Sequence, residues 1–234
     1  MRKKPSFLVY VEHPAFSIDC ADGVYEILKN AGFSVKLVGP NSYPPVELSK
    51  EILSTTDCLV VGGGLGDSDQ YDDSFLLDKS NIIRDYISNG GRYLGICMGA
   101  YIAGHYYLNI LKSNTKTTQY IKRKYSSLKK EQHDIVTVNW LGEEKNIYFD
   151  DGTAFVPRRG YKRISGKIIA KYKNGDAAAI IQNYNKGMVG VIGPHPEAHK
   201  FWFYWQTRIR NRWKDCIHHD LLLDFIKKLL YFKQ

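Results

Sequence analysis

One junction in the chain constrains the fold more than any other feature. A short apolar run, Arg92 to Ile96, is followed by Cys97 and then by small residues up to Gly104. A buried strand that ends at a Cys and continues as a helix of small residues is typical of a nucleophile elbow, a strained turn that exposes one side chain. Free Cys is also a common core residue, so the junction alone leaves a structural role for Cys97 open.

A second segment far along the chain favours a catalytic role for that thiol. A strand-like run from Val189 ends abruptly at Pro194, and His195 and Glu197 follow. A Cys nucleophile needs a base to take its proton and a third group to orient that base. If the segment is extended, side chains two residues apart point the same way, and both can face one site. The two segments together predict a Cys97, His195 and Glu197 triad.

The chain resembles the class I glutamine amidotransferase-like superfamily, whose triad is Cys, His and Glu in that order. Within it, the sequence is most similar to the amidotransferase-like domain at the N-terminus of biotin-protein ligases and its stand-alone relatives. The segments that carry the resemblance are 89–101, 147–155, 170–172, 177–181 and 186–197. The intracellular protease and chaperone branch of the same fold matches less well, because it has a His where this chain has Met98.

The resemblance implies an α/β fold of three layers, flavodoxin-like, with a mostly parallel sheet, helices on both faces and a β-rich insertion between the nucleophile and the catalytic His. The sequence pattern agrees with it, because strand and helix alternate up to residue 96 and short strands follow from residue 134. We expect one domain over residues 1–234, with a basic insertion at about 112–133 and C-terminal helices at about 199–232. No biotin ligase catalytic domain is expected, since the chain ends about forty residues after Glu197.

Further site residues are expected in the loops that leave the carboxyl ends of the strands, where ligands bind in open α/β sheets. The resemblance implies an oxyanion hole made by backbone N–H groups of Gly63 or Gly64 and of Met98. A phosphate-binding role for this glycine-rich loop is disfavoured, because the required spacing of Gly and Lys is absent. The candidate substrate contacts are His13, Asp67 and Tyr101. The acidic cluster around Asp67 is interpreted either as a site for a cationic ligand or as a solvated loop, and the solvated loop is favoured.

Composition limits the other classes of function. The four Cys residues are scattered without a C-x-x-C pair, which indicates neither a zinc site nor a disulfide framework and favours a reducing cytoplasm. We expect no metal and no cofactor. No apolar run approaches the length of a membrane span, so no membrane partner is expected. The net charge of +9 would permit binding of nucleic acid, but the basic run from Lys112 to Lys130 has few aromatic residues and is interpreted as a solvated insertion or lid.

The predicted function is a cysteine-dependent amide hydrolase that acts on a small amide through a thioester intermediate. The helix after Cys97 and an imidazolium at His195 are expected to lower the pKa of the Cys97 thiol below its free value of about 8.5. The alternative is a non-catalytic regulatory module that keeps the pocket and serves a partner protein. A basic nucleic-acid-binding protein is the third and less favoured class. The residues leave the substrate and the oligomeric state open.

Overall fold

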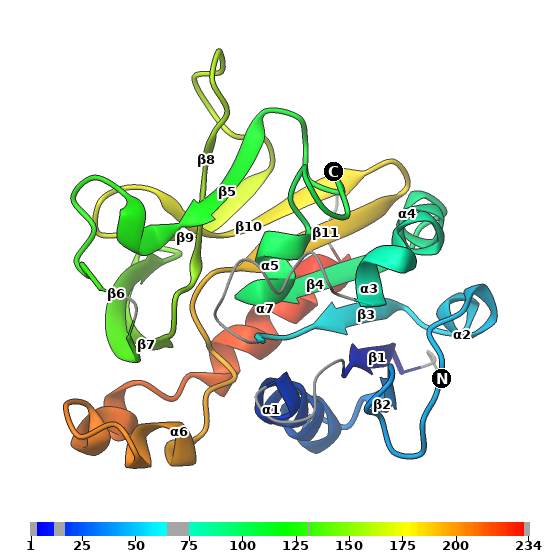
Figure 1. The fold of residues 1–234 in the computed structure, drawn as a ribbon, viewed down its shortest axis with the longest axis horizontal. Helices are drawn as coiled ribbons and strands as arrows, with labels where there is room; N and C mark the ends of the chain where they lie inside the picture. The colour runs from blue at the N-terminus through cyan, green and yellow to red at the C-terminus, as the bar shows by residue number, and fades with distance from the viewer. Residues whose placement is uncertain (1–3, 12–16, 65–74, 131, 232–234) are drawn as a thin grey trace.

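A single large mixed sheet forms the centre of the protein (Figure 1). The structure is a computed structural model, and it describes residues 4–11, 17–64, 75–130 and 132–231. The main path of the sheet runs β2-β1-β3-β4-β11-β10-β9-β6-β7, and β8 and β5 continue from β10 off this path. The predicted α/β fold is confirmed, but the sheet is mixed where a mostly parallel one was expected, because the strands beyond β11 are antiparallel.

The first five strands along this path are parallel to one another. Their bounds are β2 Ser34–Val38, β1 Ser6–Tyr10, β3 Cys58–Val61, β4 Arg92–Ile96 and β11 Gly187–Ile192. The central strands are short apolar runs, and every residue of β3 and of β11 is buried. Such continuous apolar runs are expected for parallel strands that helices cover on both faces.

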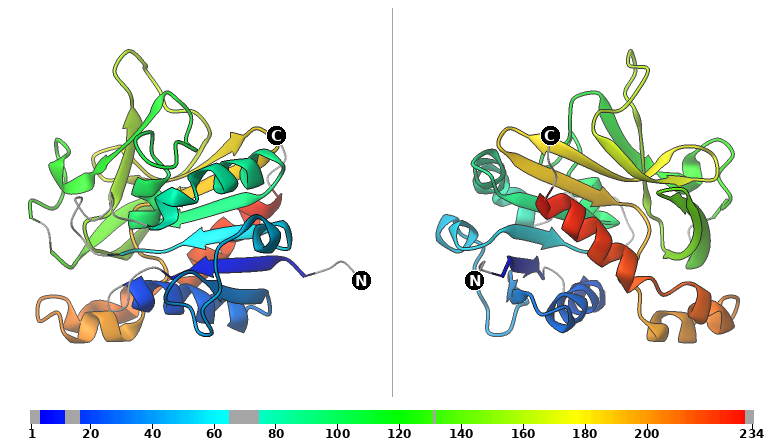
Figure 2. Two further views of the ribbon diagram at one scale, coloured as in Figure 1. Left: turned by 45° about the vertical axis from the view of Figure 1, so that its right-hand side comes forward. Right: turned by 180° about the vertical axis from the view of Figure 1, so that it is seen from behind.

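Helices cover both faces of the parallel region (Figure 2). One face packs against α1 Ser17–Asn30 and α7 His219–Tyr231, whose apolar side chains share a core with the strands. The other face packs against α2 Lys50–Ser54, α3 Phe75–Asp78, α4 Ser80–Ser88 and α5 Met98–Ile102. The three-layer arrangement predicted from the sequence is therefore present.

Antiparallel strands extend the sheet beyond β11, and they gather at one end of the molecule (Figure 1). Their bounds are β10 Ala177–Tyr184, β9 Lys167–Tyr172, β6 Asp134–Trp140 and β7 Glu143–Phe149. These strands occupy the interval between Cys97 and His195 where the resemblance implies a β-rich region. The first residues after β7, at 150–153, lead back to the Cys97 turn.

The basic segment differs from the solvated insertion or lid that its charge suggested. It contains β5 Thr115–Gln119, which pairs along its length with β8 Thr153–Pro157, and a 3-10 turn at Tyr120–Lys122. The Tyr120 ring is fully buried and stacks on Tyr172, with ring centroids 3.8 Å apart. Arg123 forms an ion pair with Asp176, Nε to Oδ2, at 2.7 Å. Aromatic packing and a paired strand hold this segment against the sheet, so the lid interpretation is wrong.

The C-terminal region, where helices were expected, contains three separate elements. It holds α6 Lys200–Tyr204, a 3-10 turn at Arg210–Asp215 and α7. α6 ends at Tyr204, and the next residue, Trp205, is 77% exposed. The guanidinium of Arg92, at the start of β4, donates to the backbone oxygens of Leu229 and Leu230 and ties α7 to the strand that precedes Cys97. Within the described residues, no helix has the length and apolar character needed to cross a membrane.

A close backbone contact fixes the junction between β4 and α5. A Cβ atom on Gly99 would collide with the backbone oxygen of Val61 in β3, and one on Gly95 would collide with the backbone oxygen of Gly99. The Gly99 N–H donates to the Gly62 oxygen at 3.1 Å. The two glycines are therefore required by contact between backbones.

We predict that Gly99→Ala lowers the free energy of unfolding by about 1–3 kcal/mol or more, the usual cost of overpacking, because the contacted carbonyl belongs to a central strand and cannot move aside. Urea denaturation followed by circular dichroism measures this change. Gly23→Ala is the matched control, since Gly23 also lies in a helix and its added Cβ meets mainly the His199 ring, a side chain that can move. Equal stability of the two variants would contradict the prediction.

Candidate active site

The backbone at Cys97 has the strained conformation of a nucleophile elbow. Its φ of 50° and ψ of −105° lie outside the regions that L-residues prefer, and such strain persists only where the surroundings hold it. The Cys97 N–H donates to the Ile192 oxygen at 2.9 Å, and the Cys97 oxygen accepts from the Thr153 hydroxyl at 3.1 Å. Hydrogen bonds on both sides of the residue therefore hold the turn.

His195 and Glu197 are in direct contact, as predicted. The Nδ1 of His195 lies 2.9 Å from Oε1 of Glu197, and both side chains are buried. The local backbone differs from the extended segment expected, because the Ala198 N–H donates to the His195 oxygen at 3.2 Å and closes a turn. Pro196 takes the second position of this turn, which its fixed φ favours. The turn, rather than strand alternation, brings the carboxylate back to the ring.

Aromatic side chains enclose the His195 ring. Tyr148 in β7 and Trp202 in α6 both pack against it edge to face, with centroid distances of 6.0 and 5.4 Å. The backbone N–H of His195 also donates to the backbone oxygen of Tyr148 at 2.9 Å. Backbone and ring contacts together fix the orientation of the imidazole, with Nδ1 on the carboxylate and Nε2 on the opposite side of the ring.

The Cys97 thiol lies near this imidazole, but its hydrogen bond goes elsewhere. Its Sγ donates to the Asp150 backbone oxygen at 3.3 Å. Cys97 and His195 are close enough for each to shift the pKa of the other. The buried Nε2 of His195 nevertheless has no hydrogen-bond partner of good geometry among the described residues. The resting thiol is thus held as a donor to a carbonyl, with a vacant nitrogen near it.

Burial raises the pKa of the Cys97 thiol, and the neighbouring His195 lowers it by less. The lowered pKa expected from the sequence is therefore wrong. That expectation relied on a helix dipole, but α5 has only five residues, and the carboxylates of Asp150 and Asp151 raise the pKa further. For His195, burial is the largest effect and favours the neutral ring. The charges that raise the pKa of this ring are those of a Cys97 thiolate and of Glu197, and the thiolate charge is absent while Cys97 is S–H. The ring is therefore neutral beside the resting thiol and gains a proton when the thiol loses one.

The predicted oxyanion-hole groups lie around the same turn. A Cβ on Gly63 would come within 2.7 Å of His195 Cε1, and a Cβ on Gly64 would collide with the Met98 side chain. The structure brings Gly63, Gly64 and Met98 together with Cys97 and His195.

Of the three predicted substrate contacts, Tyr101 lies within the described residues. The Tyr101 hydroxyl donates to the backbone oxygens of Asp151 and Gly152, so it braces the loop whose preceding carbonyl accepts from the Cys97 thiol. His13 and Asp67, with the rest of the acidic cluster, lie outside the described residues.

Cys20 is the site residue that the sequence analysis did not single out. It lies in the first turn of α1, and its thiol interacts with the His195 ring. One ligand atom from each of Cys20, His195 and Glu197 lies within 4.8 Å of the other two. Its position could have been inferred, because the helix after β1 starts at the same edge of a parallel sheet as the Cys97 turn.

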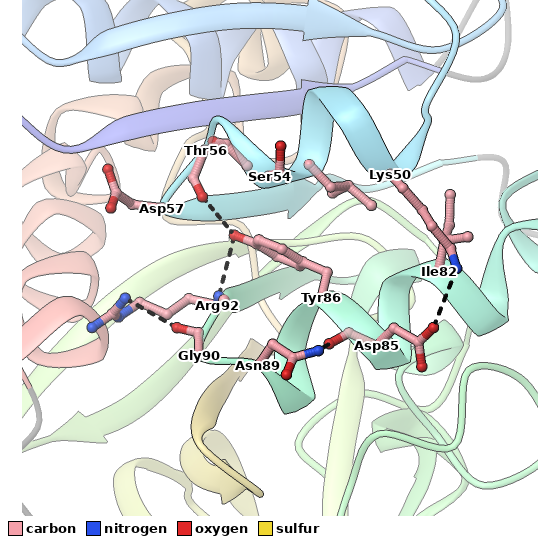
Figure 3. Close-up of a pocket in the computed structure, with 12 residues that line it drawn as sticks. Lys50, Ser54, Thr56, Asp57, Ile82, Asp85, Tyr86, Asn89, Gly90 and Arg92 are labelled. Atoms are coloured by element: carbon pink, nitrogen blue, oxygen red, sulfur yellow. Dashed lines mark hydrogen bonds and ion pairs between the residues drawn. The ribbon is translucent and has the colours of Figure 1, made fainter.

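A separate cavity of about 470 Å³ lies at the opposite edge of the sheet (Figure 3). It is lined by residues before β3 and β4, such as Thr56, Gly90 and Arg92. The Tyr86 hydroxyl in it donates to the Thr56 oxygen and accepts from the Arg92 N–H. No Cys or His lines it. Cys97 and His195 therefore lie at the carboxyl ends of the strands, away from this cavity.

Sequence comparison relates the chain to one family. Residues 44–107, which include Cys97 and end before His195, match the family model described as biotin-protein ligase, N terminal. A biotin–protein ligase of Schizosaccharomyces pombe is 27% identical over 168 residues, which are 62% of this chain and 26% of that protein. The match therefore spans about a quarter of the relative's length.

Solved structures share the fold at low identity. A glutamine amidotransferase from Thermotoga maritima superposes with a TM-score of 0.61 at 12% identity, covering 97% of this chain and 98% of that one. A cytoplasmic protein from Salmonella typhimurium gives a TM-score of 0.58 at 12% identity, covering 96% and 98%. These findings show that the chain has the fold of the glutamine amidotransferase structures, and that part of it is similar to the N-terminal region of biotin-protein ligases.

Proposed function

We propose that the protein is a cysteine-dependent amide hydrolase that acts on a small carboxamide through a thioester on Cys97. The observation that carries the proposal is the alignment of His195, with Nδ1 on the Glu197 carboxylate at 2.9 Å and an unpartnered Nε2 near the Cys97 thiol. A buried imidazole oriented by a carboxylate is the arrangement that activates a nucleophile. The strained turn at Cys97 supports the same role.

The first step is transfer of the thiol proton. The Cys97 S–H leaves the Asp150 carbonyl and turns to His195, whose Nε2 takes the proton as the sulfur attacks the carboxamide carbon. The imidazolium that forms is stabilised by Glu197. Because burial disfavours a free thiolate, proton transfer accompanies the attack instead of preceding it.

The later steps return the proton. The carbonyl oxygen becomes an oxyanion, which the N–H groups of Met98 and of Gly63 or Gly64 can stabilise. His195 then gives its proton to the leaving nitrogen, the C–N bond breaks, and ammonia or an amine departs from the thioester. Water attacks the thioester with His195 as base, and the proton goes back to the Cys97 sulfur, which yields the acid and the resting enzyme.

A non-catalytic binding module is the second candidate, and one observation favours it. The Cys97 thiol is 6% exposed, is held by a backbone carbonyl and has a raised pKa. A pocket kept for a partner protein needs no reactive thiol. Full cellular function of a Cys97→Ala variant would favour this candidate over the hydrolase.

All four Cys residues of the chain are buried free thiols, a state that is usual in a reducing compartment. We therefore extend the proposal to a cytoplasmic location, where no disulfide is required of the fold.

We predict that the purified protein releases ammonia from one or more members of a panel of small primary amides, including glutamine and asparagine. Added hydroxylamine should divert part of the product to a hydroxamate, because it attacks the thioester. Cys97→Ala should abolish both products, whereas Cys58→Ala, at a buried Cys that starts β3 at the opposite edge of the sheet, should retain them. Ammonia release that survives in Cys97→Ala would contradict the mechanism.

We predict that alkylation of Cys97 by iodoacetamide is slow at pH 7 and still rises with pH above 9, since the thiol pKa is raised from 9.0. In His195→Ala the rate at pH 7 should fall further, by about tenfold for each pKa unit gained, because the imidazole lowers the thiol pKa. Peptide mass spectrometry at a series of pH values measures each Cys separately. A rate that levels off below pH 8 in the wild type would be incompatible with a protonated resting thiol.

We predict that Glu197→Gln lowers kcat/KM by about 10²–10⁴-fold, less than Cys97→Ala does, because an amide orients the imidazole without stabilising its charge. The pH profile should also shift, since loss of the Glu197 charge lowers the pKa of His195. The matched control is Glu26→Gln, at an exposed carboxylate 3.9 Å from His199. An unchanged pH profile in Glu197→Gln would remove Glu197 from the triad.

A further inference from the structure

We propose that Cys20, His195 and Glu197 form a binding site for Zn²⁺. One ligand atom of each residue lies within 4.8 Å of the other two, and all three side chains are buried. These residues come from two segments far apart in the sequence, the first turn of α1 and the turn after β11. The fold thus gathers a thiol, an imidazole and a carboxylate at one point.

One buried carboxylate oxygen of this cluster lacks a partner. Oε2 of Glu197 has no hydrogen-bond partner among the described residues, although Glu197 is completely buried. A buried carboxylate with an unsatisfied oxygen is costly, because it has lost its hydration without full compensation. A cation bound between the three side chains supplies that compensation.

The set of donors selects the type of cation. Zinc binds Cys sulfur, His nitrogen and carboxylate oxygen, usually four ligands at once, whereas Mg²⁺ and Ca²⁺ prefer oxygen alone. Soft thiolate and imidazole ligands therefore favour Zn²⁺ over the two common hard cations. Three protein ligands leave the fourth position of a tetrahedral ion for water.

Zinc binding at this site must release a proton. Burial raises the pKa of the Cys20 thiol to about 11, so the free protein carries Cys20 as S–H at neutral pH. The S–H bond breaks, the sulfur binds the ion as a thiolate, and the proton goes to solvent. Apparent affinity therefore increases with pH, by about tenfold per unit while one proton is released.

Bound zinc also changes the triad. An ion on His195 and Glu197 occupies the base and its orienting group, so the loaded protein cannot take the Cys97 proton. Zinc is then a reversible inhibitor, and this consequence rests on the proposed function. The binding of zinc does not rest on the proposed function, because Cys97 lies outside the three-residue cluster.

The test uses the full chain stripped of metal with a chelator, titrated with ZnCl₂ against a chromophoric chelator at pH 7 and pH 8. We expect one Zn²⁺ per chain, tighter binding at pH 8, and no binding of Mg²⁺ or Ca²⁺ at equal concentration. Co²⁺ in place of zinc should give a thiolate-to-cobalt charge-transfer band.

Cys20→Ala should weaken zinc binding at least about tenfold and remove the cobalt band, as expected for loss of one ligand. Cys216→Ala and Cys97→Ala should retain both signals, and circular dichroism checks that each variant is folded. Equal zinc affinity in Cys20→Ala and the wild type, or no stoichiometric binding to the wild type, would overturn the proposal. Either result leaves the hydrolase tests untouched, since those depend on Cys97 and not on zinc.

Discussion

The site depends first on the distance between two backbones. At the Cys97 turn, α5 packs so closely on β3 that only glycine fits at position 99, and the Gly99 N–H bonds to the Gly62 oxygen. This contact aligns the loop after β3 with the turn after β4, and β11 lies directly beside β4. The thiol, the glycine-rich loop and His195 are neighbours because three adjacent parallel strands end at the same edge. The antiparallel strands beyond β11 then supply the loop at Asp150, which holds the thiol.

The sequence predicted the parts of this arrangement that leave an apolar pattern. The run Cys58–Val61 is apolar and fully buried, and His195 with Glu197 was recognised by chemistry and spacing. Strand β5 was missed because its sequence, TKTTQ, is polar and mostly solvent-facing, so only its pairing with β8 defines it. The stacking of Tyr120 on Tyr172 joins residues 52 positions apart, which no local pattern encodes.

The errors at the site share one cause, which is tertiary burial. The pKa of Cys97 was expected to fall because a charge and a helix dipole lie near it, but desolvation outweighs both in this interior. Cys20 has no sequence motif, and its importance comes only from facing the His195 ring across the sheet edge. Local sequence describes which groups are present, whereas the fold decides how much water surrounds them, and the pKa values follow from that.

The carbonyl that accepts from the Cys97 thiol has a consequence for the lifetime of the protein. Oxidants such as peroxide attack thiolates. A buried thiol that is kept as S–H by the Asp150 oxygen therefore reacts slowly with them. The Thr153 hydroxyl holds the other side of Cys97 through the Cys97 backbone oxygen. Asp150 lies in the short loop between β7 and β8, and Thr153 is the first residue of β8. This connection between β7 and β8 therefore protects the Cys97 sulfur from irreversible oxidation while no ligand is bound.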